Sequence, residues 1–305
     1  MNSPAGHRGS APISDLQRFS HHAMAAIWEI VVRQEDHDYA AGAAAAAFET
    51  LDCLEQELSR FIENSDLSRI NHQPVGEPLR VGIAAFRCIE QGLKLRALTG
   101  RAFDCSAGAL WKGAGHEGER SGMGYLKDAE HNNPLLLDGE QFTVVRTHED
   151  VVVDLGGIAK GFAVEVLLRE LAEWDIDHVL VHGGASTAKG AGAQDGNQGW
   201  EVSVSSPGRN SRVLKTLRLH NRAVGGSGLE KGPHIIDPRT GRPADKRQAA
   251  WAMADDAAAA DAFSTAFMVM GEKEIRKVCK ETGRGAILFD YKGEMTEYGE
   301  TGRKS

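Results

Sequence analysis

The sequence predicts an α+β fold, and two features of the chain lead to this prediction. Segments of alternating apolar and polar residues, typical of antiparallel strands, follow one another directly in the second half of the chain, whereas elsewhere strand-like segments alternate with helices. No fixed-period repeat and no Pro- or Ser-rich linker divides the 305 residues, so we expect one large domain or two closely packed lobes over residues 20–305. The polar residues 1–19 are expected to form a disordered tail.

In the first half of the chain we expect one strand followed by two helices. The strand is AMAAIWEIVV, residues 23–32, and a long amphipathic helix is expected to follow it and to end at Asn64 and Ser65. The apolar residues that recur at spacings of three and four in this helix are Phe48, Leu51, Leu54, Leu58 and Phe61. SDLSRIN at 65–71 predicts a short turn or cap, and Gly100 is expected to stop the second helix.

In the second half strands predominate. Residues 113–133 are expected to form a surface excursion, and Asp138-Gly139 favours a hairpin turn. The remaining expected elements are a helix at 158–174, strands at 178–184, 199–208 and 213–228, a turn-rich loop at 232–244, a helix at 255–270 and a strand at 285–294.

Composition argues against several classes of protein. The net charge of −8 gives a nucleic-acid partner no electrostatic support. The polar N-terminal segment has no apolar core typical of a secretory signal, and no run approaches the roughly 20 apolar residues that a membrane span needs. We therefore expect a cytoplasmic protein, whose oligomeric state the sequence does not indicate.

The strongest candidate for chemistry is VVVDLGGIAKGFAVE, residues 151–165. A buried strand ends at Asp154, the chain turns on Gly156 and Gly157, and Lys160 stands in the first turn of a helix. Glycines allow close backbone approach, and the N–H groups at a helix start point toward an anion, so the stretch suits a phosphate site. An ordinary strand-to-helix turn would have the same pattern.

A second candidate is a helical pair. Asp261 and Thr265 are four residues apart and share one helix face, where a carboxylate and a hydroxyl can bind a hard cation such as Mg²⁺. The alternative is structural, with an aspartate favoured near a helix start and a threonine in the core. We expect Asp261 to be exposed in a cleft.

Three further stretches are weaker candidates. His234 lies beside a turn and can move protons near neutral pH, although such a histidine is more often structural. Asp104 follows an aromatic residue in a glycine-framed loop, where it can contact a ligand or cap a helix. VHGGAS at 181–186 and VGGSG at 224–228 are expected to be glycine loops after strands.

Taken in order, these stretches resemble the ApbE-type FAD:protein FMN transferases. The family's motif vDLGGIAKGyavD corresponds to VDLGGIAKGFAVE at 153–165. The other matches are Met24 in the first strand, SDLSRIN, GRAFD ending at Asp104, PHIIDPRTG at 233–241 and ADAFSTA at 260–266, and the resemblance runs from about residue 20 to 292. The sequence departs from the family pattern at Ala185, usually Asp or Asn, at Gly226, usually Thr, and at Phe162, usually Tyr.

The resemblance implies a bilobed, T-fold-like architecture, with mixed or antiparallel sheets flanked by helices and an FAD-holding cleft between the lobes. It implies Mg²⁺ or a similar divalent cation bound by Asp261, Thr265 and the backbone carbonyl of Ala159. The residues that match positions near the flavin nucleotide are Met24, Ala102, Phe103, Asp104, Gly156, Lys160, Phe162 and Ile236.

The implied reaction is cleavage of the FAD pyrophosphate, with FMN passed to a Ser or Thr hydroxyl of an acceptor protein and AMP released. The acceptor hydroxyl needs a base, for which Asp261 or a nearby carboxylate is a candidate and His234 the runner-up, and the sequence does not choose between them. Two alternatives stay open, a Mg²⁺-dependent FAD pyrophosphatase and a non-catalytic FAD-binding protein.

Overall fold

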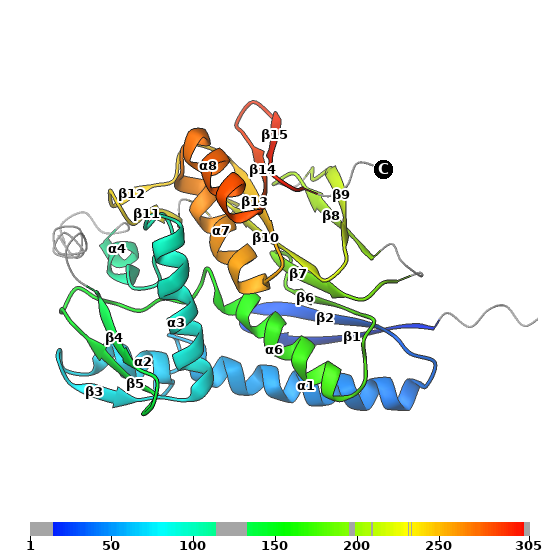
Figure 1. Cartoon of the computed structure of the whole chain (residues 1–305), viewed down its shortest axis with the longest axis horizontal. Coiled ribbons are helices and arrows are strands. Elements are labelled where there is room, and N and C mark those ends of the chain that lie inside the picture. The colour runs from blue at the N-terminus through cyan, green and yellow to red at the C-terminus, as the bar shows by residue number, and fades with distance from the viewer. Residues whose placement is uncertain are drawn as a thin grey trace, which may run out of the picture.

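The computed structural model describes residues 15–113, 133–194, 199–208, 210–230, 232 and 234–301, without the side chains of residues 111–113. An eight-stranded sheet, in the order β1-β2-β6-β7-β10-β13-β14-β15, forms its centre (Figure 1). Every neighbouring pair in this sheet is antiparallel. The strands are β1 Leu16–Ala23, β2 Ala26–Arg33, β6 Val179–Gly183, β7 Thr187–Ala191, β10 Arg222–Gly228, β13 Ala249–Ala254, β14 Gly285–Phe289 and β15 Met295–Tyr298.

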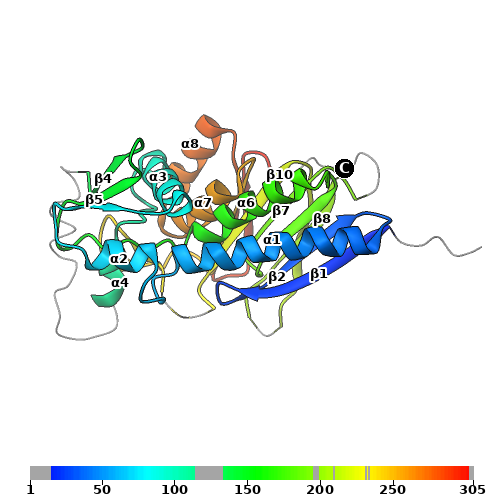
Figure 2. The same cartoon turned by 90° about the horizontal axis from the view of Figure 1, so that it is seen from below.

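Helices cover one face of the sheet and enclose the main apolar core. Figure 2 shows α1 lying along β1 and β2, and buried side chains such as Trp28, Leu51 and Phe263 pack between the layers. The helices of this part are α1 His37–Leu58, α6 Ala159–Glu173, α7 Ala257–Val269 and α8 Glu272–Thr282. In the described ranges, no helix combines the length and the apolar character that crossing a membrane requires.

A two-stranded ribbon packs on the opposite face of the sheet. It consists of β8 Trp200–Ser205 and β9 Val213–Leu219. Its Trp200 and Leu217 pack with Leu180 and Val224 of the sheet in a second, smaller apolar cluster. The central strands are therefore buried on both faces, which is why many of their residues are small and apolar.

A second group of elements lies beside the large sheet (Figure 1). Its three-stranded sheet has the order β3-β5-β4, and a separate pair of short strands is β11-β12. The bounds are α2 Asp66–His72, β3 Pro78–Arg80, α3 Ile83–Leu98, α4 Gly108–Gly113, β4 Leu135–Asp138, β5 Thr143–Arg146, β11 Ile236–Asp237 and β12 Arg242–Pro243. Helices and antiparallel strands in these two groups confirm the predicted α+β class.

Two N-terminal boundaries differ from the sequence prediction. Strand β1 begins at Leu16 and pairs with β2 along its length, so residues 16–19 belong to the sheet and not to a tail. Residues 1–14 lie outside the described part. Helix α1 ends at Leu58, because the backbone of Ser59 is already extended; the N–H of Ser59 makes the last helical bond, to the Glu55 carbonyl. Phe61 is 84% exposed as a result, and its place in the apolar spacing is accidental.

In the second half, the hairpin at Asp138-Gly139 and the helix expected at 158–174 are confirmed by β4-β5 and by α6. The stretch VGGSG at 224–228 forms most of strand β10, so the strand expected there is confirmed and the glycine loop expected there is wrong. A Cβ atom at Gly225 would lie 2.4 Å from the carbonyl carbon and oxygen of Ala260, so this glycine allows α7 to pack closely on the strand. Most of the excursion expected at 113–133 falls in residues 114–132, which are not described.

Candidate active site

The strand-like segment that ends at Asp154, just before the glycine turn, is held in place by hydrogen bonds to a side chain and to a neighbouring loop. The Asn71 side chain forms two hydrogen bonds with Val153, accepting from its N–H at 2.7 Å and donating to its carbonyl at 2.9 Å. On the other side, the N–H of Asp154 donates to the Cys105 carbonyl at 2.8 Å, and Ala107 bridges Val152 in parallel. These bonds place the loop that contains Asp104 beside the start of the glycine turn.

Asp154 organises the glycine turn itself. One carboxylate oxygen accepts the N–H of Gly156 at 2.9 Å, and the other forms an ion pair with Arg60 at 2.8 Å. The turn leads into α6, whose N-cap residue Ile158 makes no side-chain hydrogen bond. The N-terminus of α6 therefore lacks the usual cap from its own chain segment.

Asp261 supplies a carboxylate to this helix end. Its Oδ2 accepts the N–H of Gly161 at 3.2 Å, and its Oδ1 accepts the Thr187 hydroxyl at 3.0 Å. Asp261 does not cap its own helix, because Asp256 is the N-cap of α7 and accepts from the N–H of Ala259. The side chain is only 3% exposed, so the expectation of an exposed carboxylate in a cleft was wrong. The burial results from the close packing of α6, α7 and β7 around it.

Among the residues that the structure describes, Asp261 forms no ion pair. A buried carboxylate without a cationic partner is costly, and a bound cation would offset that cost. The described residues contain no cluster of three or more His, Cys, Asp or Glu side chains that suits a metal. Mg²⁺ needs no such cluster, because it is usually held by one or two carboxylates together with neutral oxygens and waters.

Thr265 provides a neutral oxygen one turn after Asp261. Its hydroxyl lies 3.1 Å from the Ser227 hydroxyl and 3.4 Å from the Asp261 carbonyl. Ala159, whose carbonyl is the third predicted ligand, is the first residue of α6, two positions before the Gly161 N–H that binds Asp261. A carboxylate, a hydroxyl and a carbonyl oxygen, as on Asp261, Thr265 and Ala159, are the kinds of donor that a hard cation prefers.

The glycine turn meets this helix directly. A Cβ atom at Gly157 would lie 3.0 Å from Thr265 Oγ1 and 3.2 Å from Cε2 of Phe103. Three stretches that are far apart in the sequence, around residues 103, 157 and 265, thus come together at one point.

We expect Gly157→Ala to lower FAD affinity by at least about tenfold, roughly 1.4 kcal/mol. The backbone of Gly157 does not require a positive φ, so the added methyl group acts through its contacts with Thr265 and Phe103. Titration of the purified protein with FAD measures the change, and thermal melting reports the accompanying loss of stability.

Gly139→Ala is the matched control, because a Cβ there meets only Phe86 at 3.9 Å. A Gly157→Ala protein that melts early but binds FAD normally would show that Gly157 serves only the packing of the turn.

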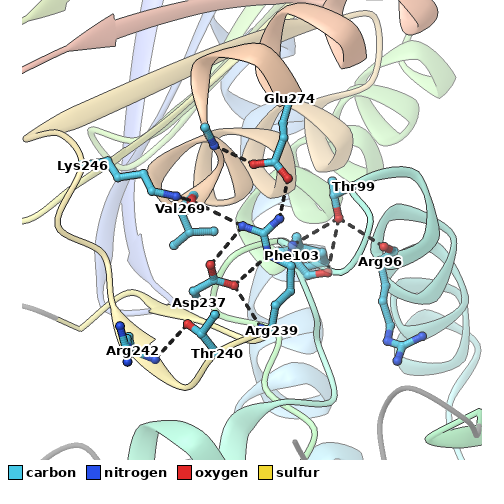
Figure 3. Close-up of polar contacts among 11 residues, drawn as sticks. Arg96, Thr99, Phe103, Asp237, Arg239, Thr240, Arg242, Lys246, Val269 and Glu274 are labelled. Atoms are coloured by element: carbon cyan, nitrogen blue, oxygen red, sulfur yellow. Dashed lines mark hydrogen bonds and ion pairs between the residues drawn. The ribbon is translucent and has the colours of Figure 1, made fainter.

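The loop before the glycine turn is fixed from within. Asp104 has a fully buried side chain that forms an ion pair with Arg96 at 2.6 Å and accepts from the Ser106 hydroxyl at 2.6 Å. The N–H of Phe103 donates to the Thr99 hydroxyl at 3.1 Å (Figure 3). Asp104 thus orders the loop that carries Ala102 and Phe103, both buried, and its contact with a flavin stays a prediction.

The thiol next to Asp104 is not a nucleophile. Burial, followed by the charge of Asp104, raises the pKa of Cys105 far above its ordinary value. Burial also raises the pKa of Cys88. Both cysteines are therefore neutral packing residues at physiological pH.

The remaining predicted residues lie around this centre. Lys160 stands in the first turn of α6 and Phe162 is buried in the same helix. Met24 occupies the β1-β2 turn with φ of 50° and packs against the main core. A Cβ atom at Gly184, in the turn between β6 and β7, would lie 3.0 Å from the Cβ of Ala26, the first residue after the β1-β2 turn. The two turns therefore lie next to each other.

His234 is exposed and Ile236 is half-buried, and both precede the DPRTG turn. His234 Nδ1 is 2.8 Å from the Gly232 carbonyl. Arg239 binds Asp237 through Nε at 2.9 Å and Glu274 through Nη1 at 2.9 Å, and it also reaches the Val269 carbonyl at the end of α7 (Figure 3). The turn is therefore tied to the helix that carries Asp261 and Thr265, but no contact between His234 and Asp261 is described.

Sequence reasoning missed two polar residues of the site, Thr187 and Ser227. Thr187 begins β7 directly after the expected glycine loop at 181–186, and Ser227 lies in β10 within the stretch 224–228, for which a glycine loop was also expected. Ser227 has its hydroxyl 2.8 Å from that of Ser264 and 3.1 Å from that of Thr265. An available signal was strand alternation, which places Ser227 two residues after Gly225 on the side that faces α7.

The same alternation explains the departure at Gly226. Its neighbours Gly225 and Ser227 face α7, so position 226 faces the opposite side of the sheet, where a Cβ would lie 2.7 Å from Cδ1 of Trp251. The indole of Trp251 occupies the space where a larger side chain would stand. The substitution therefore removes no group from the side of the sheet that contains Asp261.

The structure thus combines an α+β fold with a glycine turn, a buried carboxylate and a neighbouring hydroxyl at one point. The model of the ApbE family matches residues 24–289, which is most of the chain. The chain therefore belongs to the ApbE family, and the resemblance found in the sequence is confirmed.

Individual relatives agree with this assignment. The FAD:protein FMN transferase of Salmonella typhimurium is 26% identical over 294 residues, covering 89% of this chain and 83% of the relative. The FAD:protein FMN transferase of Vibrio cholerae is 29% identical over 241 residues, covering 73% and 72%. Among solved structures, the ApbE protein of Thermotoga maritima is 26% identical with a TM-score of 0.80, covering 95% of this chain and 100% of that one. The flavin transferase ApbE of Vibrio cholerae, 23% identical with a TM-score of 0.78 and coverage of 93% and 97%, shares the fold.

Proposed function

We propose that this chain is a Mg²⁺-dependent FAD:protein FMN transferase. The observation that carries the proposal is the convergence at Gly157, where the glycine turn meets Thr265 of the helix that carries Asp261 and Phe103 of the predicted flavin loop. Membership of the ApbE family and relatives named FAD:protein FMN transferase support the same reaction.

In the proposed reaction, a Ser or Thr hydroxyl oxygen of an acceptor protein attacks the phosphorus on the FMN side of the FAD pyrophosphate. The bond from this phosphorus to the bridging oxygen breaks, AMP leaves with that oxygen, and FMN stays on the acceptor as a phosphoester. The hydroxyl proton passes to a base. Atoms and charge balance without a further reactant.

Backbone and side-chain groups of this chain would bind the pyrophosphate. The turn at Gly156 and Gly157 permits close approach of the backbone, and Lys160 supplies a positive charge in the first turn of α6. Asp261, Thr265 and the Ala159 carbonyl would hold the cation, which when bound neutralises charge on the pyrophosphate. Met24, Phe103, Phe162 and Ile236 are proposed to surround the flavin nucleotide.

We infer that His234, rather than Asp261, is the base. Both oxygens of Asp261 already accept hydrogen bonds, and the side chain is buried. His234 is exposed, and its Nδ1 lies 2.8 Å from the Gly232 carbonyl. That carbonyl favours the tautomer with a proton on Nδ1, which leaves the Nε2 lone pair to accept the hydroxyl proton.

The test is an assay of AMP release from FAD by the purified chain, with Mg²⁺ or with a chelator, and with or without a Ser/Thr-containing acceptor protein. A transferase produces AMP together with acceptor that carries covalent flavin. Equal amounts of FMN and AMP without an acceptor would instead identify a pyrophosphatase, and FAD binding without AMP release a non-catalytic protein.

We expect Lys160→Ala to weaken FAD binding by about 1–3 kcal/mol, the size of a hydrogen bond to a charged group. Lys160 forms no ion pair with any residue in the described ranges, so its loss should barely affect stability. Lys277→Ala on α8, where the lysine side chain is 73% exposed, is the control. An unchanged FAD dissociation constant for Lys160→Ala would exclude the lysine from the phosphate site.

A further inference from the structure

The carboxylate of Asp261 lies where three elements meet, and glycines make this meeting possible. A Cβ at Gly161 would lie 2.2 Å from the Ala257 carbonyl oxygen, and a Cβ at Gly225 would lie 2.4 Å from the Ala260 carbonyl. Without side chains at these positions, α6 and β10 both approach the first turns of α7. Asp261, in the same part of α7, is thereby brought within hydrogen-bond distance of a neighbouring helix and of the sheet.

Thr187 is the residue of the sheet that contacts the Asp261 carboxylate. It begins β7, is 3% exposed and pairs in register with Gly225. Its hydroxyl donates to Asp261 Oδ1 at 3.0 Å, while the N–H of Gly161 donates to Oδ2 at 3.2 Å. Each carboxylate oxygen thus receives one bond, and since an ionised carboxylate offers about four acceptor positions, roughly two remain open.

The neighbouring cation on the same face of β7 is directed away from Asp261. Lys189, two residues after Thr187, binds both oxygens of Glu165 at 2.8 and 3.0 Å and the Asp255 carbonyl at 2.7 Å. The group that reaches Asp261 from β7 is therefore a neutral hydroxyl. A hydroxyl fixes the rotation of the carboxylate without neutralising its charge, whereas an ammonium group at the same place would compete with a metal ion.

We propose that Thr187 is a positioning residue for the cation site, holding the Asp261 carboxylate in the rotation in which its open lone pairs bind a divalent cation. The inference rests on the role of Asp261 in the proposed function. It assigns to β7 a part in cation binding in addition to that of the two helices. Loss of such an outer hydrogen bond typically lowers metal affinity by about 10- to 100-fold.

The test measures Mn²⁺ binding to the metal-free, full-length protein by electron paramagnetic resonance of the free ion, without FAD and without turnover. Thr187→Val removes the hydroxyl and keeps the shape, and we expect it to lower Mn²⁺ affinity by at least about tenfold. Thr187→Ser keeps the hydroxyl donor, so we expect its Mn²⁺ affinity to stay within about threefold of that of the unaltered chain. This change is clearly smaller than the tenfold loss expected for Thr187→Val. Thr282→Val, which removes a hydroxyl bonded to the Val278 carbonyl on α8, should leave the affinity unchanged.

Asp261→Asn separates the two proposals. If the unaltered chain binds Mn²⁺, Asp261→Asn does not, and Thr187→Val binds as tightly as the unaltered chain, the cation site stands and the role of Thr187 is wrong. If the unaltered chain and Asp261→Asn give the same titration, the cation site itself is wrong, and the inference about Thr187 is overturned with it.

If Thr187→Val does not fold, a second pair of variants still tests whether Thr187 positions the Asp261 carboxylate. Thr187→Ser and Thr187→Cys have similar size, but a thiol is a much weaker hydrogen-bond donor than a hydroxyl. The proposal requires Mn²⁺ affinity to fall from Ser to Cys while the melting temperatures stay close. Equal affinities in this pair would overturn it.

Discussion

Asp261→Asn is expected to reduce Mg²⁺-dependent AMP release from FAD by at least about a hundredfold, the scale of losing a major electrostatic contact in an active site. Asparagine keeps the shape of the side chain, and its carbonyl oxygen can still accept the Thr187 hydroxyl. Its amide group would then face the N–H of Gly161, where the structure has Asp261 Oδ2 accepting at 3.2 Å. The charge needed for a divalent cation is lost in either orientation.

The same replacement should cost some stability, because two donors would meet at the start of α6. We expect about 1–3 kcal/mol, the cost of a buried donor without an acceptor. AMP release measured against Mg²⁺ concentration, together with thermal melting, separates the two effects. Asparagine is a better test than alanine, since alanine would also leave a cavity at a position that is only 3% exposed. Unchanged Mg²⁺-dependent activity in Asp261→Asn would remove this residue from the site.

Gly161→Ala is expected to destabilise the protein by about 3 kcal/mol or more, at the upper end of what overpacking a core costs. The added Cβ would lie 2.2 Å from the Ala257 carbonyl oxygen and 2.6 Å from Ala258 Cα. These are backbone atoms of α7, so relief requires a shift of one helix relative to the other. Such a shift would also lengthen the bond between the Gly161 N–H and Asp261.

Gly42→Ala is the matched control for this prediction. Like Gly161, Gly42 lies inside a helix and faces a packed neighbour. A Cβ atom at Gly42, however, would lie 3.6 Å from the Trp174 ring, which is an ordinary contact distance. Since alanine is favoured over glycine inside a helix by roughly 0.5–1 kcal/mol, this variant should be neutral or slightly stabilising. Denaturant unfolding of both variants gives the comparison. Equal stabilities would show that α6 and α7 adjust freely to each other.

Local signals predicted much of the fold. The bounds of α6 agree with the expected helix within one residue at each end, because a glycine turn and a helical apolar spacing are both contained in the stretch itself. Strand β1 was missed because, as an edge strand, it has mostly half-exposed and polar side chains, so it lacks an apolar alternation. The error at VGGSG has a different origin. Glycine usually indicates a turn, but in β10 it serves the packing of α7, which is distant in the sequence.

The candidate site, like the fold, could be predicted only in part. The sequence predicted the glycine turn and the Asp261–Thr265 pair, and the structure brings Gly157 and Thr265 into contact. It did not predict that Asp261 is buried, because burial depends on how closely two helices and a strand approach. Thr187 and Ser227 were missed for the same reason, as their role depends on the sheet face to which they point.

The contact between Gly226 and Trp251 couples the side-chain sizes that the two positions can accept. The two residues are register partners on adjacent strands, and the indole ring fills the volume that a side chain at 226 would need. A threonine at position 226 would therefore clash with the indole of Trp251 unless the ring moved. A variant with a larger residue at 226 should need a smaller residue at 251, so the two positions are expected to tolerate change only as a pair. This constraint lies on the side of the sheet that faces away from Asp261, and it is therefore independent of catalysis.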